Sequence, residues 1–310
     1  MRVLVTGCAG FIGCHLAERL LGDGHTVVGL DNLSSGQVRN AADLRRHERF
    51  TFVEHDITRP LPDVGPCAQV YNLACPASPA DFSRVPLAIL AVNSAGVWNL
   101  LDWCQAHGAV LLHSSTSEVY GDPHVHPQPE SYWGHVNPIG ERSCYDEGKR
   151  FAEALLTAYA ARHGVAVRIA RIFNTYGPRM RGDDGRALPN FINQALAGAP
   201  LTLHGDGSQT RSFCYVSDLV DGLVRLMNSP VTGPVNLGNP VEITVRQIAE
   251  EVIALTGSRS TLTCVPRPAD DPSVRRPDIT RARTLLGWEP RVDRATGLAR
   301  TVEWFRTSGA

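Results

Sequence analysis

The sequence has 310 residues, which at ~150 residues per domain corresponds to two domains or one large domain. With 43% hydrophobic and 20% charged residues, the composition excludes disordered, collagen-like and coiled-coil proteins. The 30 basic and 31 acidic residues give a net charge of −1, which favours neither nucleic acid nor a membrane as a partner. Apolar runs shorter than the ~20 residues of a membrane span, and no apolar leader after Met1, predict a cytoplasmic location.

The first half of the chain alternates short β-branched runs with amphipathic stretches, the pattern of an α/β protein with a doubly wound parallel sheet. The predicted strands are residues 2–6, 26–30, 51–54, 69–73, 110–114 and 166–172. The predicted helices are residues 11–21, 85–106 and 144–163. From about residue 174, glycine and proline pairs divide the chain into shorter elements.

We therefore expect a sheet domain over residues 1–173 and a smaller α/β portion over residues 174–310, with the chain free to cross between them. In such folds ligands bind beyond the carboxyl ends of the strands. The eight cysteines include no C-x-x-C pair, so we expect free, mostly buried thiols. His124 and His126 are two residues apart in a proline-rich loop, and we expect no metal there.

Gly7, Gly10 and Gly13 follow the first predicted strand and open the first predicted helix. Such a turn lets the backbone approach a pyrophosphate, which then faces the N–H groups of the helix that starts at Phe11 and Ile12. A glycine triplet can also serve close packing of a helix on a strand. Its position between strand and helix favours the dinucleotide site of a Rossmann fold.

Asp31 ends the second predicted strand, ~20 residues beyond the glycines, where a carboxylate can bond the ribose hydroxyls. The same carboxylate repels a 2′-phosphate, which favours NAD over NADP; the alternative is a simple turn residue. We assign the adjacent Asn32 to this site. Residues after the third and fourth strands that would border adenine and ribose, or else be plain loop residues, are Asp56, Ile57, Leu73 and Ala74.

Tyr145 and Lys149 are four residues apart in a predicted helix, so their side chains share one face. An ammonium beside a phenol lowers the pKa of the phenol from ~10, and such a tyrosine can take a proton from a substrate alcohol. Both residues also bind the cofactor in this interpretation. The alternative is that Tyr145 and Lys149 are an ordinary exposed pair on the helix, which is the usual reason for a tyrosine and a lysine four residues apart. The upstream nucleotide motif and Thr116, just beyond a predicted strand, favour an enzyme.

In these motifs the chain resembles the extended short-chain dehydrogenase/reductases that act on nucleotide sugars. The most specific stretches are residues 72–79, 116–123, 126–128, 132–140, 144–150, 171–180, 209–213 and 275–279. Cys8 and Cys14 depart from the Gly and Ser that relatives commonly carry, and both are small enough to leave the turn intact.

The resemblance implies NAD-dependent decarboxylation of UDP-glucuronate to UDP-xylose. Tyr145 acts as the base, Lys149 tunes it and Thr116 holds the C4 oxygen. Oxidation at C4 gives a β-keto acid that loses carbon dioxide, and the enolate is reprotonated at C5 before C4 is reduced again. Three alternatives stay open: a UDP-glucuronate 4-epimerase, a decarboxylase that releases UDP-4-keto-pentose and NADH, and a silent NAD-binding regulator.

The resemblance also implies that Ser117 bonds the substrate carboxylate and that Glu118 positions water or the sugar for protonation at C5. Arg275 matches the active-site arginine of the family, whose fork suits a carboxylate or a phosphate. The alternatives are a strand-end cap for Ser117 and Glu118, and a solvated pair of Arg275 with Arg276.

Asn174 and Arg211 match positions that hold the diphosphate and nucleotide in these enzymes. Arg179 follows a Gly-Pro turn and would either reach a phosphate or lie on the surface. Relatives pair through two long helices, so the resemblance implies a homodimer through residues 85–106 and 144–163.

Overall fold

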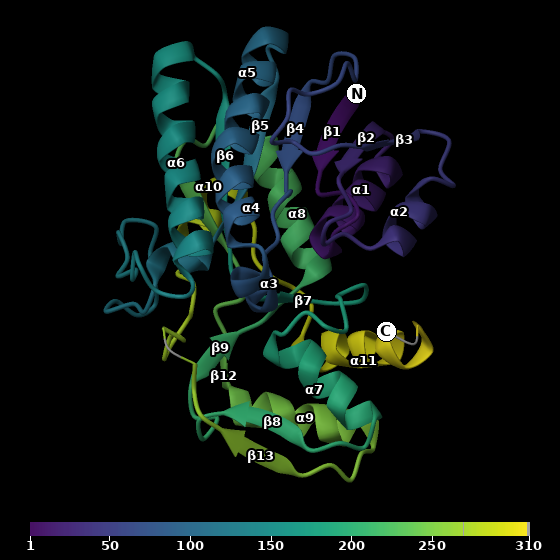
Figure 1. Cartoon of the computed structure of the whole chain (residues 1–310), viewed down its shortest axis with the longest axis vertical. Coiled ribbons are helices and arrows are strands. Elements are labelled where there is room, and N and C mark those ends of the chain that lie inside the picture. Colours follow the sequence, from purple (N-terminus) through teal and green to yellow (C-terminus); the bar gives the residue numbers. More distant parts are fainter. Residues whose placement is uncertain (269, 309–310) are drawn as a thin grey trace.

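A seven-stranded parallel sheet forms the centre of the computed structural model, which describes residues 1–268 and 270–308 (Figure 1). Its strand order is β11-β6-β5-β4-β1-β2-β3, and every neighbouring pair is parallel. The strands are β1 (Arg2–Thr6), β2 (Thr26–Asp31), β3 (Phe50–Glu54), β4 (Gln69–Asn72), β5 (Val110–Thr116), β6 (Val167–Ile172) and β11 (Pro234–Leu237). The predicted doubly wound α/β sheet is confirmed.

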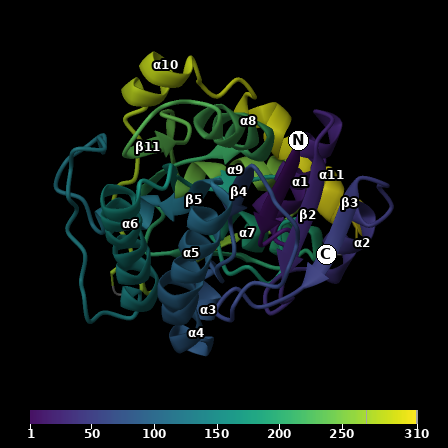
Figure 2. The ribbon, with the colours of Figure 1, turned by 90° about the horizontal axis from the view of Figure 1, so that it is seen from above.

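Helices cover both faces of this sheet (Figure 2). Successive strand residues point to opposite faces, and apolar residues on both faces must be buried. Val3 and Val5 of β1 pack into the core on the side of α1 (Phe11–Gly22) and α8 (Val216–Met227). Leu4 between them packs into the core on the side of α5 (Val97–His107) and α6 (Ser143–His163).

The predicted helix over residues 85–106 is a continuous helical run, with a π-helical turn in its middle. It consists of α4 (Pro86–Ala91), η1 (Val92–Gly96) and α5. By length and composition alone, the run Pro86–His107 is long and apolar enough to cross a membrane, contrary to the sequence expectation. Buried core helices meet the same criteria, and here α4 and α5 pack on α6 and α5 also packs on β5.

A smaller layer lies below the sheet domain in Figure 1. Its parallel strands β8 and β13 are packed by α7 and α9, and α11 contacts both helices. The bounds are α7 (Ala187–Leu196), β8 (Leu201–His204), α9 (Val245–Thr256), β13 (Leu262–Val265) and α11 (Arg294–Ser308). Between α7 and α9 the chain returns to the sheet domain to form α8 and β11.

Short elements complete the described chain. They are α2 (Val38–Leu44), α3 (Pro79–Arg84), η2 (Ser117–Tyr120), β7 (Thr175–Tyr176), β9 (Thr210–Ser212), β10 (Cys214–Tyr215), β12 (Glu242–Thr244) and α10 (Thr280–Leu286). β7 pairs with β10 in parallel and β9 with β12 antiparallel, which joins segments at the junction of the two parts. All eight cysteines are free thiols, and six of them are buried.

The carboxyl ends of the parallel strands meet at the edge that faces the smaller layer. One cavity there is lined by residues that follow β1, β4, β5 and β6, including Gly7, Leu73, Ser117 and Asn174. This is the position at which a doubly wound sheet binds its ligands.

Candidate active site

The glycine turn brings the start of α1 to the cavity. Gly7 has a φ of +72°, which suits glycine, and its N–H donates to the Leu30 carbonyl at 2.8 Å. A Cβ on Gly7 would lie 2.7 Å from the Leu73 carbonyl carbon, and one on Gly13 would lie 2.0 Å from the Gly7 oxygen. Gly10, Phe11, Ile12 and the two other glycines line the cavity, so the turn fits a pyrophosphate.

Asp31 lies at the end of β2, where its buried carboxylate is held in place by the backbone. It accepts from the N–H groups of Ala9 at 2.9 Å and Leu33 at 2.8 Å, while burial raises its pKa. The side chain of Asn32 donates to Asp56 at 3.1 Å. A second cavity is lined by Gly7 and Gly10 of the glycine turn and by the residues assigned to adenosine, which are Asp31, Asn32, Asp56, Ile57, Leu73 and Ala74. These residues fit the adenosine half of NAD.

Asp31→Ala is expected to weaken NAD binding by about 10-fold or more, because a hydrogen bond to a charged group contributes ~1.5–3 kcal/mol. Titration calorimetry with NAD measures the change. Asp63→Ala, which removes an exposed carboxylate bonded to Gly65, serves as the control. Unchanged NAD affinity in Asp31→Ala would leave Asp31 as a residue of the turn only.

Tyr145 and Lys149 both reach the cavity from the first turns of α6, and Thr116 reaches it from the end of β5. Tyr145 is buried and stacks on Phe82, with ring centroids 4.9 Å apart. The Lys149 ammonium, also buried, donates to the Ser114 carbonyl at 2.8 Å and lies 5.8 Å from the centre of the Tyr145 ring. The three residues of the expected proton-transfer group therefore converge on one space.

The pKa of Tyr145 departs from the sequence expectation. Burial raises this pKa above its ordinary value and the nearby Cys75 adds to the effect, whereas the hydrogen bond with Thr116 lowers it. Burial outweighs the lowering expected from the Lys149 ammonium, and burial also lowers the pKa of Lys149 itself. Without a ligand in the cavity, the neutral phenol is therefore the favoured form of Tyr145.

Glu118 lies in η2 between two arginines. Its carboxylate accepts from the Arg142 guanidinium at 2.7 Å and also from Arg275, which in turn donates to the Gly121 carbonyl at 2.9 Å. Burial alone would raise the pKa of Glu118, but the charges of Arg275 and Arg142 outweigh it and hold the pKa at about 2. Glu118 is therefore an anion at neutral pH, which is compatible with the expected role of positioning water or the sugar for protonation at C5.

The residues assigned to the nucleotide end lie in an adjoining cavity. Asn174, Glu118 and Arg142 line both this cavity and that of Tyr145, and Arg211 and Arg275 line the nucleotide end. Arg211 is mostly buried and contacts Asp271 at 2.9 Å. The two cavities thus join where Glu118 lies.

Arg179 lies apart from these residues. It has a φ of +68° and its guanidinium pairs with Glu18 of α1 at 2.6 Å, with Asp43 at 3.9 Å. In the described part of the chain, Arg179 lines neither the cavity of Tyr145 nor the adjoining cavity of Arg211. Its guanidinium faces acidic side chains of α1 and α2 in this structure, and the phosphate contact of Arg179 stays a prediction.

Sequence reasoning missed three features of the site. Arg142 precedes Tyr145 by three residues, about one helical turn, so the two side chains lie on the same face and Arg142 also reaches the cavity. Asp146 is buried next to Glu118, and burial followed by the Glu118 charge raises its pKa to about 8. Arg186 lines the cavity from a loop, and no local pattern predicts this.

The histidines of the proline-rich loop bind protein groups. His126 contacts Glu242 at 2.9 Å, and the His124 ring lies 4.1 Å from the ring of His135. Among residues 1–268 and 270–308, no cluster of His, Cys, Asp and Glu has the arrangement of a metal site.

Comparison with known proteins agrees with this geometry. The chain is 53% identical over 304 residues to UDP-glucuronic acid decarboxylase 1 of Danio rerio, which covers 98% of this chain and 72% of the relative. The structure superposes on UDP-glucose 4-epimerase of Thermotoga maritima, solved with UDP-glucose, with a TM-score of 0.93, 31% identity and full coverage of both chains.

It also resembles UDP-glucuronic acid 4-epimerase of Bacillus cereus, solved with UDP-glucuronic acid and NAD, with a TM-score of 0.88 and 29% identity over 99% of this chain and 100% of that one. Residues 3–238 match the family described as the NAD dependent epimerase/dehydratase family. The expected cofactor, NAD, is thereby confirmed. The chain belongs to the NAD dependent epimerase/dehydratase family, the extended short-chain dehydrogenase/reductases.

Proposed function

We propose that the protein is an enzyme that decarboxylates UDP-glucuronate to UDP-xylose, with NAD regenerated in each cycle. The observation that carries this proposal is the position of Arg142 and Arg275, two arginines that flank Glu118 where the reaction cavity meets the nucleotide cavity. Guanidinium groups are suited to a carboxylate, and a carboxylate at C5 distinguishes glucuronate from neutral hexoses. The name of the Danio rerio relative supports the same substrate.

In the proposed reaction Tyr145 removes the proton of the C4 hydroxyl while Thr116 holds the C4 oxygen. NAD, when bound in the cavities lined by the glycine turn and Asp31, would supply the hydride acceptor and a positive charge. Lys149, fixed on the Ser114 carbonyl, contributes a second positive charge near the Tyr145 ring. The ionised form of Tyr145, disfavoured by burial, is stabilised by these two charges together.

The sugar carboxylate in this proposal lies beside Ser117 and the two arginines, next to the C4 ketone that forms. Carbon dioxide leaves because the ketone accepts the electron pair of the C5–C6 bond. Since Glu118 is held as an anion, it repels the carboxylate and shares the arginines with it. This arrangement keeps the arginines from over-stabilising the charge that the reaction must disperse.

Incubation with UDP-glucuronate tests the proposal, with carbon dioxide and absorbance at 340 nm recorded together. The expected result is carbon dioxide without lasting NADH, and UDP-xylose as the product in NMR spectra. Carbon dioxide with stoichiometric NADH would instead identify a producer of UDP-4-keto-pentose. Absence of carbon dioxide would contradict decarboxylation, and NMR would then distinguish an epimerase from a silent NAD-binding protein.

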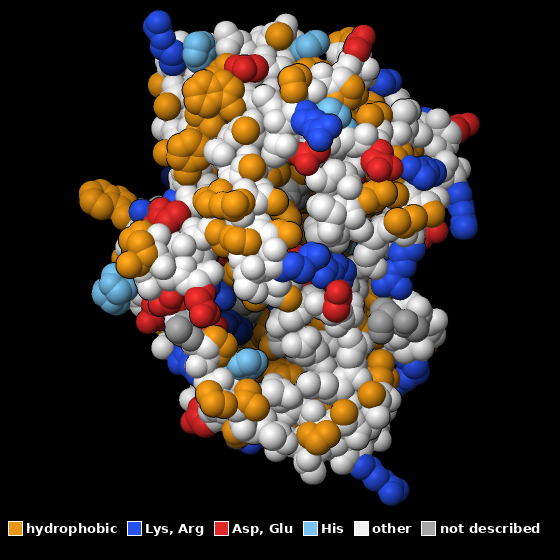
Figure 3. Space-filling view, in the orientation of Figure 1, with side chains coloured by type: hydrophobic (Ala, Val, Ile, Leu, Met, Phe, Trp, Pro, Cys, Tyr) orange, Lys and Arg blue, Asp and Glu red, His pale blue; other side chains and the backbone are white. Residues whose placement is uncertain are grey.

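We also propose that two copies pair through α4, α5 and α6. Figure 3 shows hydrophobic side chains gathered on the face formed by these helices. Leu87, Leu90, Trp98 and Phe151 are each 40–78% exposed, although they are large apolar residues. A standard interface buries ~800 Å² per partner, and such a face supports one. Phe151→Asp should give monomers in light scattering, whereas Val38→Asp on α2 should not.

A cytoplasmic location remains part of the proposal. Free thiols are stable in a reducing compartment, and all eight cysteines are unpaired. Fluorescence microscopy of the tagged protein in its native cells tests the location.

A further inference from the structure

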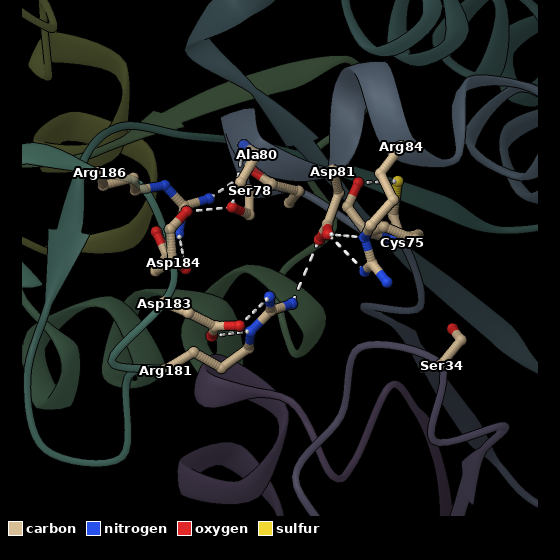
Figure 4. Close-up of polar contacts among 12 residues, drawn as sticks. Ser34, Cys75, Ser78, Ala80, Asp81, Arg84, Arg181, Asp183, Asp184 and Arg186 are labelled. Atoms are coloured by element: carbon tan, nitrogen blue, oxygen red, sulfur yellow. Dashed lines mark hydrogen bonds and ion pairs between the residues drawn. The ribbon is translucent and has the colours of Figure 1, made fainter. Parts of the chain in front are cut away.

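Asp81, a buried carboxylate in the wall of the cavity, pairs with one arginine of its own helix and with another from a distant part of the chain (Figure 4). The side chain of Asp81 is only 1% exposed. It accepts from Arg84 of its own helix at 2.6 Å and from Arg181, 100 residues away, at 3.2 Å. Arg84 therefore neutralises Asp81 locally, whereas Arg181 ties two segments together.

Two further contacts join the same segments. The hydroxyl of Ser78 donates to the Asp184 carbonyl, and the Arg186 guanidinium donates to the Ala77 carbonyl at 2.5 Å. We call residues 77–84 together with residues 181–186 the strap. Three contacts along its length hold its two halves side by side.

The strap closes the cavity that holds the glycine turn and Tyr145. Ala77, Ser78, Asp81, Arg181 and Arg186 line that cavity. Asp81 and Arg181 also line an open depression on the outer side. Arg84 lines the outer depression but, within the described chain, not the cavity. The Asp81–Arg181 pair thus forms part of the wall between the cavity and the solvent.

We infer that the Asp81–Arg181 contact retains the cofactor inside the cavity until the reaction cycle is complete. The inference rests on the proposed function, in which C4 gives up a hydride and must receive it back. If NADH leaves early, the balance is UDP-glucuronate plus NAD⁺ giving UDP-4-keto-pentose, carbon dioxide and NADH. The proton lost from the C4 hydroxyl is then matched by the proton gained at C5. The strength of the strap decides between this leak and UDP-xylose.

Arg181→Gln removes the one charge pair among the three contacts that join the two halves, and it leaves Asp81 paired with Arg84. Enzyme loaded with NADH is mixed with excess NAD, and the decay of NADH fluorescence gives the dissociation rate without any turnover. We expect this rate to rise about 10-fold, because NADH leaves only when the strap opens and the loss of a contact across the strap makes opening more frequent. During turnover, the share of UDP-4-keto-pentose in the product should rise several-fold.

Arg84→Gln is the matched control, since it removes a guanidinium of the same charge from the same carboxylate but does not cross the strap. Its NADH release should stay within about twofold of the wild type. Asp183→Asn removes the other partner of Arg181, an exposed carboxylate, and should also have little effect. If Arg181→Gln folds poorly, Arg181→Lys should show faster release by a smaller factor.

Unchanged NADH release in both Arg181 variants would overturn the inference. Equal acceleration by Arg84→Gln would also overturn it, because the charge balance of Asp81 rather than the strap would then control release. If the wild type yields no carbon dioxide, the proposed function fails, but the NADH release rates still test the strap.

Discussion

Tyr145→Phe is expected to lower turnover by ~10²-fold or more, because the variant loses the group that accepts the C4 proton. Binding of UDP and NAD should be nearly unchanged. The phenyl ring can still stack on Phe82, and Lys149 keeps its bond to the Ser114 carbonyl. Single-turnover absorbance at 340 nm measures the oxidation step, and titration calorimetry with UDP measures binding.

Tyr159→Phe is a matched control on the same helix. The Tyr159 hydroxyl bonds Asp102 and Gln105, away from the cavity, so its removal tests the loss of a tyrosine hydroxyl from α6 in general. Its turnover should remain close to that of the wild type. Near-normal turnover of Tyr145→Phe would assign the base to another group.

The fold was predictable where the residues of one short stretch determine the local structure by themselves. The six predicted strands lie within two residues of the observed ones, because apolar β-branched runs between turn residues specify buried parallel strands. The glycine turn and the Tyr145–Lys149 pair are likewise local patterns. The π-helical turn η1 was missed because it changes the helix by a single turn without a glycine or proline at its start.

The return of the chain to the sheet was harder to predict. β11 pairs with β6 more than 60 residues upstream, and α8 packs on α1. A strand of four residues carries little signal, and its partner is chosen by tertiary contacts. The predicted domain boundary at residue 173 therefore lies just after the sixth strand of the sheet. The seventh strand, β11, comes from the part of the chain that was assigned to the smaller portion.

The arginines of the site show the same limit. Arg179 and Arg181 differ by two positions in one loop, yet Arg179 pairs with Glu18 of α1 and Arg181 reaches Asp81 at the cavity. The positive φ at Arg179 turns the backbone between them, and sequence patterns do not specify that turn. Arg142 was predictable in principle, from its spacing to Tyr145.

Glu118 is the residue on which the proposed decarboxylation most depends after oxidation. Its carboxylate pairs with Arg142 and Arg275, and it lies where the two cavities join. In Glu118→Gln the amide keeps the shape of the side chain but carries no charge. The two guanidinium groups then lose their shared anion, so we expect them to bind the substrate carboxylate more tightly.

Tighter binding of that carboxylate has opposite effects on the two chemical steps. Hydride loss from C4 depends on Tyr145 and Lys149, so NADH should still form on mixing with UDP-glucuronate. Loss of carbon dioxide disperses the carboxylate charge, so ground-state stabilisation by the arginines should slow this step by about 10-fold or more. A single-turnover trace at 340 nm with trapped carbon dioxide measured in parallel separates the steps.

Glu153→Gln is the control for Glu118→Gln, because Glu153 is also ion-paired with an arginine, Arg171 at 2.7 Å, but does not line either joined cavity within the described chain. It should retain the wild-type ratio of carbon dioxide to NADH. Loss of the NADH signal in Glu118→Gln would place Glu118 in oxidation or binding. Full activity would show that the two arginines work without their shared anion, and Glu118 would then only cap the end of β5.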